Sequence, residues 1–212
     1  MLADWRRTQR EGLISARLAA TLGVVECLMT GSPGDLPAVV AAAADAGVSL
    51  PALRSAGYIN YGFNAINRIA DALGAALPDA PDLRKSSRVL LTVGYRPLSG
   101  EFFGLIRSRP VSQPEQLLND LRCTVVSGPG LLPGSVRASL FDAEGTTQLA
   151  AFARQVADGA WTVTDDDIRI LREAGQLEDE IFEAAICSAL GAATRRLDGL
   201  VDTMEALVWK GR

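Results

Sequence analysis

Two stretches of the chain, 128 residues apart, share one helical pattern. The first runs over residues 39–73 and the second over 167–201, and each is typical of a short helix, an Ala-Gly turn and a long amphipathic helix. Similarity at a fixed offset indicates a duplicated supersecondary unit whose two copies bury their apolar faces together. The positions that match without a gap include the turns Ala46-Gly47 and Ala174-Gly175 and the pairs Ala65 with Ala193, Arg68 with Arg196 and Ile69 with Leu197.

Helical periodicity and turn residues predict helices in the rest of the chain as well. The expected starts are Asp35, Ser49, Pro114, Pro133, Thr146, the Thr164–Asp167 capping box and Glu178, after a first helix over residues 4–29. The helix opened by Pro114 would turn Leu117, Leu118, Leu121 and Val125 inward, and the last helix would run to Val208. Within residues 84–113 the run RVLLTVGY has β-branched content but no second strand to pair with, so a helix is expected there too. The predicted class is all-α.

Length and composition fit one helical domain. The chain has 212 residues, 48% hydrophobic and 22% charged, which is enough to bury a core. We expect a single domain over 1–212, with related halves at about 1–80 and 112–212 joined by 81–111.

Charge and hydropathy bear on partners and location. The net charge of −4 argues against nucleic acid, and no apolar run approaches the ~20 residues of a membrane span. The opening residues lack the apolar stretch of a signal peptide, so a cytoplasmic location is expected.

The residue types that are missing exclude several kinds of chemistry. The chain has no histidine, which removes the commonest general base and metal ligand and any Ser-His-Asp or Cys-His pair. Cys27, Cys123 and Cys187 are scattered and form no C-x-x-C, so we expect buried thiols, no metal and no cofactor. Cys27 beside Glu26 is a weak candidate for a lone peroxidatic thiol, although a helix C-terminus and a carboxylate would raise its pKa.

A polar stripe on the helix over 50–73 is the main candidate site. It consists of Asn60, Asn64, Asn67 and Asp71, with Arg68 at its edge and Tyr61 beside it. Three asparagines lower helix propensity, so something should offset their cost. Three interpretations stay open: a hydrogen-bond network joining the two repeats, a solvated surface, and a ligand site. We expect at least two of the stripe's four side chains to be buried and bonded to Arg68, to backbone, or to residues around Arg195 and Arg196.

Two further patterns have competing interpretations. The matched residues Arg68 and Arg196 would have an ordinary capping or ion-pair role with nearby acids such as Asp71 or Asp198, whereas an inward-facing pair would bind a carboxylate or phosphate. The stripe formed by Leu197, Leu200, Val201, Met204, Leu207 and Val208 is typical of a core or of a subunit contact. Because one domain may leave such a stripe uncovered, it favours a homo-oligomer, a dimer or higher.

Several phrases resemble the alkylhydroperoxidase AhpD-like superfamily, which includes carboxymuconolactone decarboxylase-like proteins. They are TDDDIRILREAGQLEDEIFEAA, GFNAINRIADALG and, for the "peroxidase-related" branch, SGPGLLPGSVRASLF followed by LAAFARQVADGAWTVTDDDI. The resemblance covers about residues 115–205 and 36–75 and implies a helical AhpD-like fold. The family's working site is a helix-borne C-x-x-C with a nearby Glu and His, and this chain has neither motif nor histidine.

The sequence therefore predicts a degenerate AhpD-like protein without the redox dithiol, serving in binding or assembly, with a small-molecule ligand as one partner. One alternative is an acid/base enzyme of carboxymuconolactone decarboxylase-like type that uses carboxylates, tyrosine or arginine. The other is a weak single-cysteine peroxidase that uses Cys27.

Overall fold

The regular structure of the protein is helical wherever it is described. The computed structural model describes residues 12, 14–31, 34–74 and 114–210, except for the side chains of 208–210. Within these ranges there is no strand, which confirms the all-α class. The helix expected over 84–113 lies outside the described residues.

The chain divides into two compact units, Met1–Gly74 with Arg122–Arg212, and Ala75–Leu121. The larger unit contains the candidate site. The predicted organisation as one domain of related halves stays a prediction. The helices are α2 (Ala16–Thr30), α3 (Leu36–Asp45), α4 (Leu50–Ala72), α7 (Pro114–Ser127), α8 (Gly134–Phe141), α9 (Gln148–Gly159), the 3-10 turn η1 (Ala160–Thr162), α10 (Asp165–Glu173) and α11 (Glu178–Lys210).

Both stretches of the predicted repeat have the expected local shape. In each, a short helix (α3 or α10) ends at an Ala-Gly turn and leads into a long helix (α4 or α11). Gly47 and Gly175 take the left-handed conformation, with φ of +78° and +93°, which glycine adopts without steric cost. Their common origin stays a prediction.

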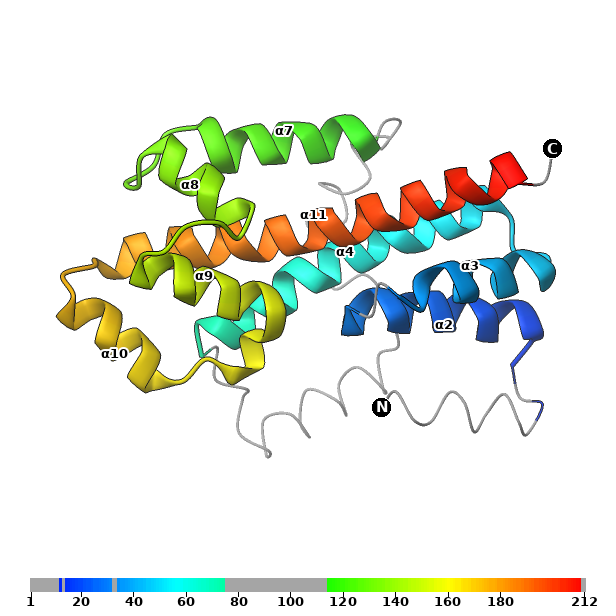
Figure 1. Cartoon of the computed structure of the whole chain (residues 1–212), viewed down its shortest axis with the longest axis horizontal. Helices are drawn as coiled ribbons and strands as arrows, with labels where there is room; N and C mark the ends of the chain where they lie inside the picture. Colours follow the sequence, from blue (N-terminus) through cyan, green and yellow to red (C-terminus); the bar gives the residue numbers. More distant parts are fainter. Residues whose placement is uncertain (1–11, 13, 32–33, 75–113, 211–212) are drawn as a thin grey trace, which may run out of the picture. The chain divides into compact units, whose positions relative to one another are not determined.

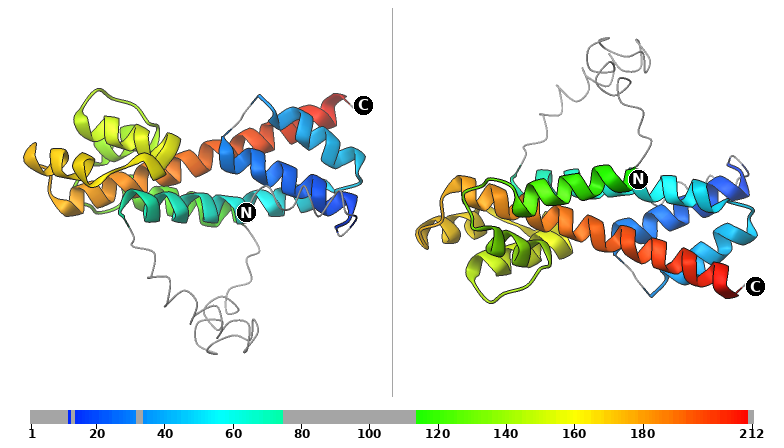
Figure 2. Two further views of the ribbon diagram at one scale, coloured as in Figure 1. Left: turned by 90° about the horizontal axis from the view of Figure 1, so that it is seen from below. Right: turned by 90° about the horizontal axis from the view of Figure 1, so that it is seen from above.

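The two long helices form the centre of the larger unit. Figure 1 shows α4 and α11 side by side, with α2 and α3 towards the C-terminal end of α11 and α8, α9 and α10 towards its other end. The two turned views in Figure 2 show the same arrangement. Since α11 contacts α3, α4, α8 and α9, it packs against helices from both predicted halves of the chain.

The predicted apolar stripe of α11 lies in the core of its own chain. Leu197, Leu200 and Met204 are buried, and Leu200 and Met204 pack with the apolar side chains of α2, α3 and α4. Val201 and Leu207 are half-buried, and the side chain of Val208 is outside the described residues. The stripe therefore offers little apolar surface to a partner, and the expected homo-oligomer loses this support.

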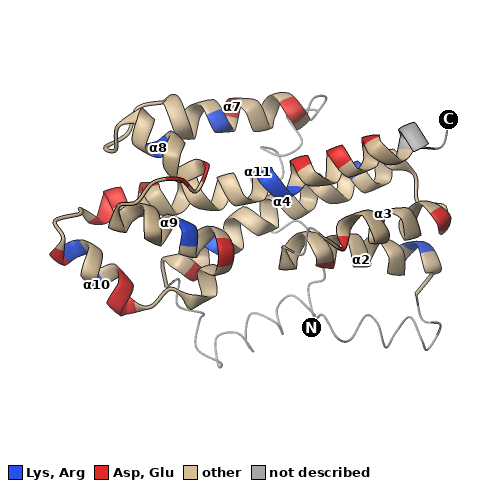
Figure 3. Cartoon of the chain, viewed as in Figure 1, with Lys and Arg blue, Asp and Glu red and all other residues tan. Residues whose placement is uncertain are grey.

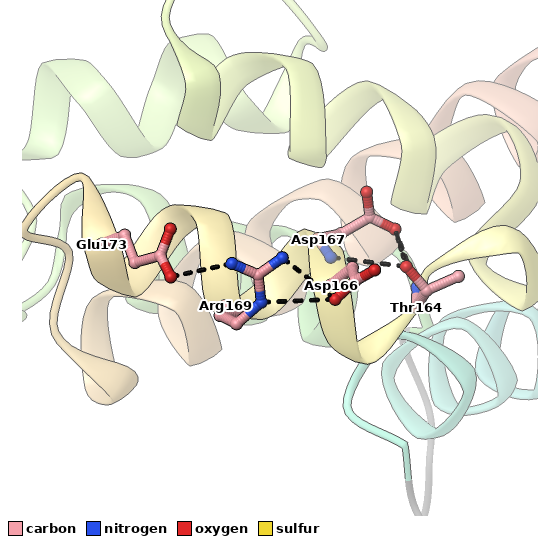
Figure 4. A network of polar contacts seen from close by, with 5 residues as sticks. All are labelled: Thr164, Asp166, Asp167, Arg169 and Glu173. Carbon is pink, nitrogen blue, oxygen red and sulfur yellow. Dashed lines mark hydrogen bonds and ion pairs between the residues drawn. The ribbon is translucent and has the colours of Figure 1, made fainter.

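Six of the seven predicted starts from Asp35 onward fit the structure, and Pro114, Pro133 and Glu178 stand at the starts of α7, α8 and α11. Ser49 accepts a hydrogen bond from the Ala52 backbone N–H at 3.4 Å. Thr164 and Asp167 form a reciprocal capping box, in which the Thr164 backbone N–H donates to Asp167 at 2.8 Å (Figure 4). The first turn of α10 is acidic, which suits the positive end of the helix dipole. Asp35 stands at the start of α3, but its side chain makes no capping hydrogen bond.

Three other predictions about helices were wrong. The helix predicted over residues 4–29 is not continuous: α2 starts at Ala16, because Gly12 has a left-handed φ of +72° and the Ser15 side chain caps α2 by accepting from Leu18 N–H. Residues 4–11 lie outside the described residues. The cap of α9 is Thr147 rather than Thr146, and it accepts from Ala150 N–H at 3.1 Å. No residue of α7 is buried, so the four side chains expected to face inward from it do not form a core stripe.

No helix among the described residues is long and apolar enough to cross a membrane.

Candidate functional site

Two asparagines of the predicted stripe are buried and bonded to each other. Asn60 and Asn64 lie one turn apart on α4, and Asn64 is fully shielded from solvent. The Asn64 amide nitrogen donates to Asn60 Oδ1 at 2.8 Å and to the Leu28 carbonyl at 3.4 Å. Asn60 donates in turn to the Val25 carbonyl at 3.4 Å. These bonds join α4 to α2, and they leave Asn64 Oδ1 facing the opposite way.

The two repeat-matched arginines meet at this oxygen. Arg196 Nη1 donates to Asn64 Oδ1 at 3.2 Å, and Arg68 Nη1 donates to the same atom. Arg68 Nη1 also donates to the Asn64 carbonyl at 3.3 Å, and its Nε donates to the Ala157 carbonyl of α9 at 3.2 Å. One amide therefore connects α4 to α11, while Arg68 connects α4 to α9.

Among the described residues, neither arginine has a counter-ion within ion-pair distance. Burial, with Arg196 as the next cause, lowers the pKa of Arg68 to about 10. Burial and then Arg195 lower the pKa of Arg196. The charge of Asp158 raises the pKa of both arginines. No described carboxylate, however, lies within 4 Å of the guanidinium nitrogens of Arg68 or Arg196, the distance that an ion pair requires. Figure 3 shows the distribution of charge along α11, with basic residues in its middle and acidic residues towards its two ends.

A cavity of about 280 Å³ lies beside this network. Its volume is near the lower end of the range typical of small-molecule sites, ~300–1,000 Å³. The wall combines apolar and small residues with two arginines and one aspartate, and it is formed by Cys27, Leu28, Gly31, Leu36, Ala157, Asp158, Ala192, Arg195, Arg196 and Gly199. Residues of α2 and α3 face residues of α9 and α11 across it, so both predicted halves of the chain contribute to it.

Of the two weak redox candidates, Cys27 and Glu26, one lines this cavity. Cys27 is buried and lines the wall, whereas Glu26 does not. Burial raises the pKa of the Cys27 thiol, and the charges of Asp35 and Glu26 raise it further. The direction agrees with the prediction, although burial is the largest cause. None of the chain's three cysteines forms a disulfide, and no group of metal-binding side chains occurs in the described part of the chain.

The other predicted site residues are dispersed. Asn67 and Asp71 share the stripe in sequence but are exposed in the structure. Tyr61 is buried, and burial is the main reason why its pKa is raised. Arg195 Nη1 donates to the Phe141 carbonyl at 2.6 Å. The network therefore contains Asn60, Asn64, Arg68 and Arg196, while Arg195 reaches only the cavity wall.

Sequence reasoning missed the cavity itself. Ala157, Asp158, Ala192 and Gly199 are ordinary helix residues, and nothing in their local pattern indicates an opening. The available signal was the pair of matched arginines, since Arg196 lies in the wall and Arg68 directly behind it.

Comparison with known proteins gives no assignment: the chain matches no family model, and neither a curated protein nor a solved structure shows significant similarity to it.

Proposed function

We propose that the chain is a non-redox protein that binds a small molecule in the cavity between α2, α3, α9 and α11. The observation that carries the proposal is the wall of this cavity, which combines an apolar lining with the partly buried guanidinium of Arg196. Apolar lining with a few polar groups is typical of small-molecule sites. A degenerate AhpD-like relationship remains part of the proposal and rests on the resemblance of sequence phrases alone.

The chemistry of the residues supports a non-redox role. A peroxidatic thiol works as a thiolate, and burial together with two carboxylates opposes ionisation of Cys27. A resolving cysteine three positions further along the helix is absent, because residue 30 is threonine. We therefore expect no more than a trace of peroxide consumption with dithiothreitol as reductant, and no change on Cys27→Ser. Robust turnover that this substitution abolishes would favour the single-cysteine peroxidase instead.

Filling the cavity tests the binding proposal. Gly199 lies on α11 in the wall, and a Cβ there would meet no atom closer than 3.9 Å, so Gly199→Leu should fill the space without a clash. The matched control is Gly62→Leu on α4, where a Cβ would meet nothing within 4 Å and no described cavity exists. The probes are octanoate and octan-1-ol, followed by amide chemical shifts of the lining residues.

We expect saturable shifts at Ala157 and Ala192 with at least one probe in the wild type and in Gly62→Leu, and their loss in Gly199→Leu. If neither probe shifts these amides at millimolar concentration, or if Gly199→Leu binds as well as the wild type, the binding proposal fails.

An acid/base enzyme is the second candidate, and one observation favours it. The carboxylate of Asp158 lines the same cavity as Arg196, so a bound molecule could contact an acidic and a basic side chain together. On this alternative Asp158→Asn would abolish turnover of a substrate while octanoate still bound. On the binding proposal the same variant would change affinity alone.

Self-association also stays a proposal. The described surface that supports it is on α4, where Ile59, Phe63 and Ile66 are each more than 60% exposed. Light scattering should then give a mass above the 22.4 kDa of one chain, and Phe63→Asp should lower it. A wild-type particle of 22.4 kDa at high micromolar concentration would contradict self-association.

A further inference from the structure

Two donor groups of Arg196 are unused. Its Nη1 donates to Asn64 Oδ1 at 3.2 Å, but Nε and Nη2 donate to no residue in the described ranges. Nε and Nη2 of Arg196 remain accessible to solvent. Among the described side chains, Arg137 Nε is the one nitrogen or oxygen atom that is fully buried and has no hydrogen-bond partner. Nε and Nη2 form the edge of a guanidinium that binds a carboxylate through two parallel hydrogen bonds.

Gly31 keeps this edge open. A Cβ at residue 31 would lie 2.7 Å from Arg196 Nη2 and 3.4 Å from Nε, so any side chain there would crowd both donors. Gly31 ends α2 in the left-handed conformation, with φ of +71°, and its N–H donates to the Cys27 carbonyl at 3.1 Å. Gly31 and Arg196 both line the cavity, so the open edge borders the cavity.

The position of this edge is fixed from behind. Asn64 Oδ1 holds Nη1 of Arg196, and Asn64 is itself held by Asn60 and the Leu28 carbonyl. A guanidinium that is already oriented loses less side-chain entropy when it binds an anion. An anion at this edge would also offset the charge that Arg68 and Arg196 bring close together.

The rest of the wall restricts what the anion can carry. Leu28, Leu36 and Ala192 provide an apolar lining that suits an alkyl or aryl body. With Arg195, Arg196 and Asp158 the wall carries two positive charges and one negative charge, and this net charge of +1 suits a single negative charge on the ligand.

We infer that the cavity binds an apolar monocarboxylic acid, whose carboxylate is held by Nε and Nη2 of Arg196 beside Gly31. This inference rests on the proposed function and adds the class of ligand to it.

Binding of octanoate and octan-1-ol by the full chain tests the inference, because the two probes share an alkyl body and differ in charge. We expect octanoate to bind about 10-fold or more tightly than octan-1-ol, as charged hydrogen bonds to a partly buried partner should give. Arg196→Lys keeps the positive charge but lacks the two-point edge, so it should remove most of this preference. Gly31→Ala keeps the arginine in the sequence but would push its guanidinium aside and obstruct the edge, so it should weaken octanoate binding by a similar factor.

Controls separate this effect from folding and from loss of the cavity. Gly175→Ala imposes the same left-handed strain at a turn where a Cβ meets nothing within 4 Å, so its octanoate affinity should equal that of the wild type. Melting temperatures show which variants remain folded. If octan-1-ol binds as tightly as octanoate, or if both Arg196→Lys and Gly31→Ala retain the preference, the ligand class is wrong while the cavity still binds. If neither probe binds, the proposed function itself fails.

Discussion

Arg68 on α4 and Arg196 on α11 occupy matching positions of the predicted repeat, but their surroundings differ. On α4 the preceding positions on the same face are Asn60 and Asn64, whose amides fill the interface and leave Arg68 buried. The matching positions on α11 are Ser188 and Ala192, which are too small to fill the same space, and Arg196 is half-buried beside a cavity. The size of the neighbouring side chains therefore decides whether an arginine is packed inside the protein or remains available to a ligand. The predictions below test this contrast.

The largest effect is expected where α11 is most tightly packed. A Cβ on Gly191 would overlap the Phe141 carbonyl oxygen at the end of α8, and backbone cannot move aside as a side chain can. Gly191→Ala should lower the free energy of unfolding by about 3 kcal/mol or more, despite the better helix propensity of alanine. Urea denaturation followed by circular dichroism measures it, with Gly62→Ala as a control that should not destabilise. A Gly191→Ala variant as stable as the wild type would mean that α8 and α11 are farther apart than the structure shows.

Asn64 should be the most important side chain of the α4 network. Asn64→Ala removes the acceptor shared by Arg68 and Arg196 and leaves the Leu28 carbonyl without this donor. Because buried partners lose their hydrogen bonds, we expect a loss of about 2–3 kcal/mol in thermal or urea unfolding. The control is Asn67→Ala on the exposed side of α4, which should be neutral or slightly stabilising. Equal stability of both variants with the wild type would show that the stripe is only solvated.

The buried thiol of Cys187, on the packed face of α11, should make the stability of the protein sensitive to alkaline pH. Burial raises the pKa of Cys187 from an ordinary 9.0 to about 11. The folded state therefore keeps a proton that the unfolded chain releases, so this contribution is complete below pH 9 and is lost as pH rises from 9 to 11. Between pH 8 and 11, Cys187→Ala should lose less stability than the wild type, by up to about 2 kcal/mol. The exposed Cys123→Ala is the control, and an identical loss in all three proteins would contradict the prediction.

The smallest effect concerns the open side of α11. A Cβ at Gly199 would make one contact, at 3.9 Å to Leu36, so alanine fits without strain. Gly199→Ala should raise the free energy of unfolding by about 0.5–1 kcal/mol, the ordinary gain of alanine over glycine inside a helix. Thermal unfolding measures this gain. Destabilisation would mean that the space beside Gly199 is smaller than the structure shows.

The sequence predicted the helical class, the turns and most helix starts, and it missed the starts of α2 and α9. The left-handed glycines of the Ala-Gly turns and the Thr164 capping box are local features, and local features can be inferred from neighbouring residues. The start of α2 was missed because periodicity continues through Gly12 and Ser15, and α9 was misplaced because Thr146 and Thr147 are equally good caps.

The site was predicted in part for a similar reason. The cost of asparagine in a helix indicated burial, and Asn60 and Asn64 are indeed buried. Asn67 and Asp71 have the same residue character and spacing but face outward, since burial depends on which helices pack against α4. The cavity could not be predicted, because it results from the small size of Ala192, Gly199 and Gly31 and not from any chemical group that these residues provide.

The single amide oxygen of Asn64 also restricts the order in which this sequence can diverge. Loss of Arg196 first would leave Arg68 bonded to both Asn64 and the Ala157 carbonyl. Loss of Asn64 first would leave two desolvated cations without their shared acceptor, an intermediate that selection against unstable proteins would remove. Divergent descendants of this chain should therefore retain Asn64 longer than Arg196, and a new ligand preference can arise at the open arginine while the network behind it stays unchanged.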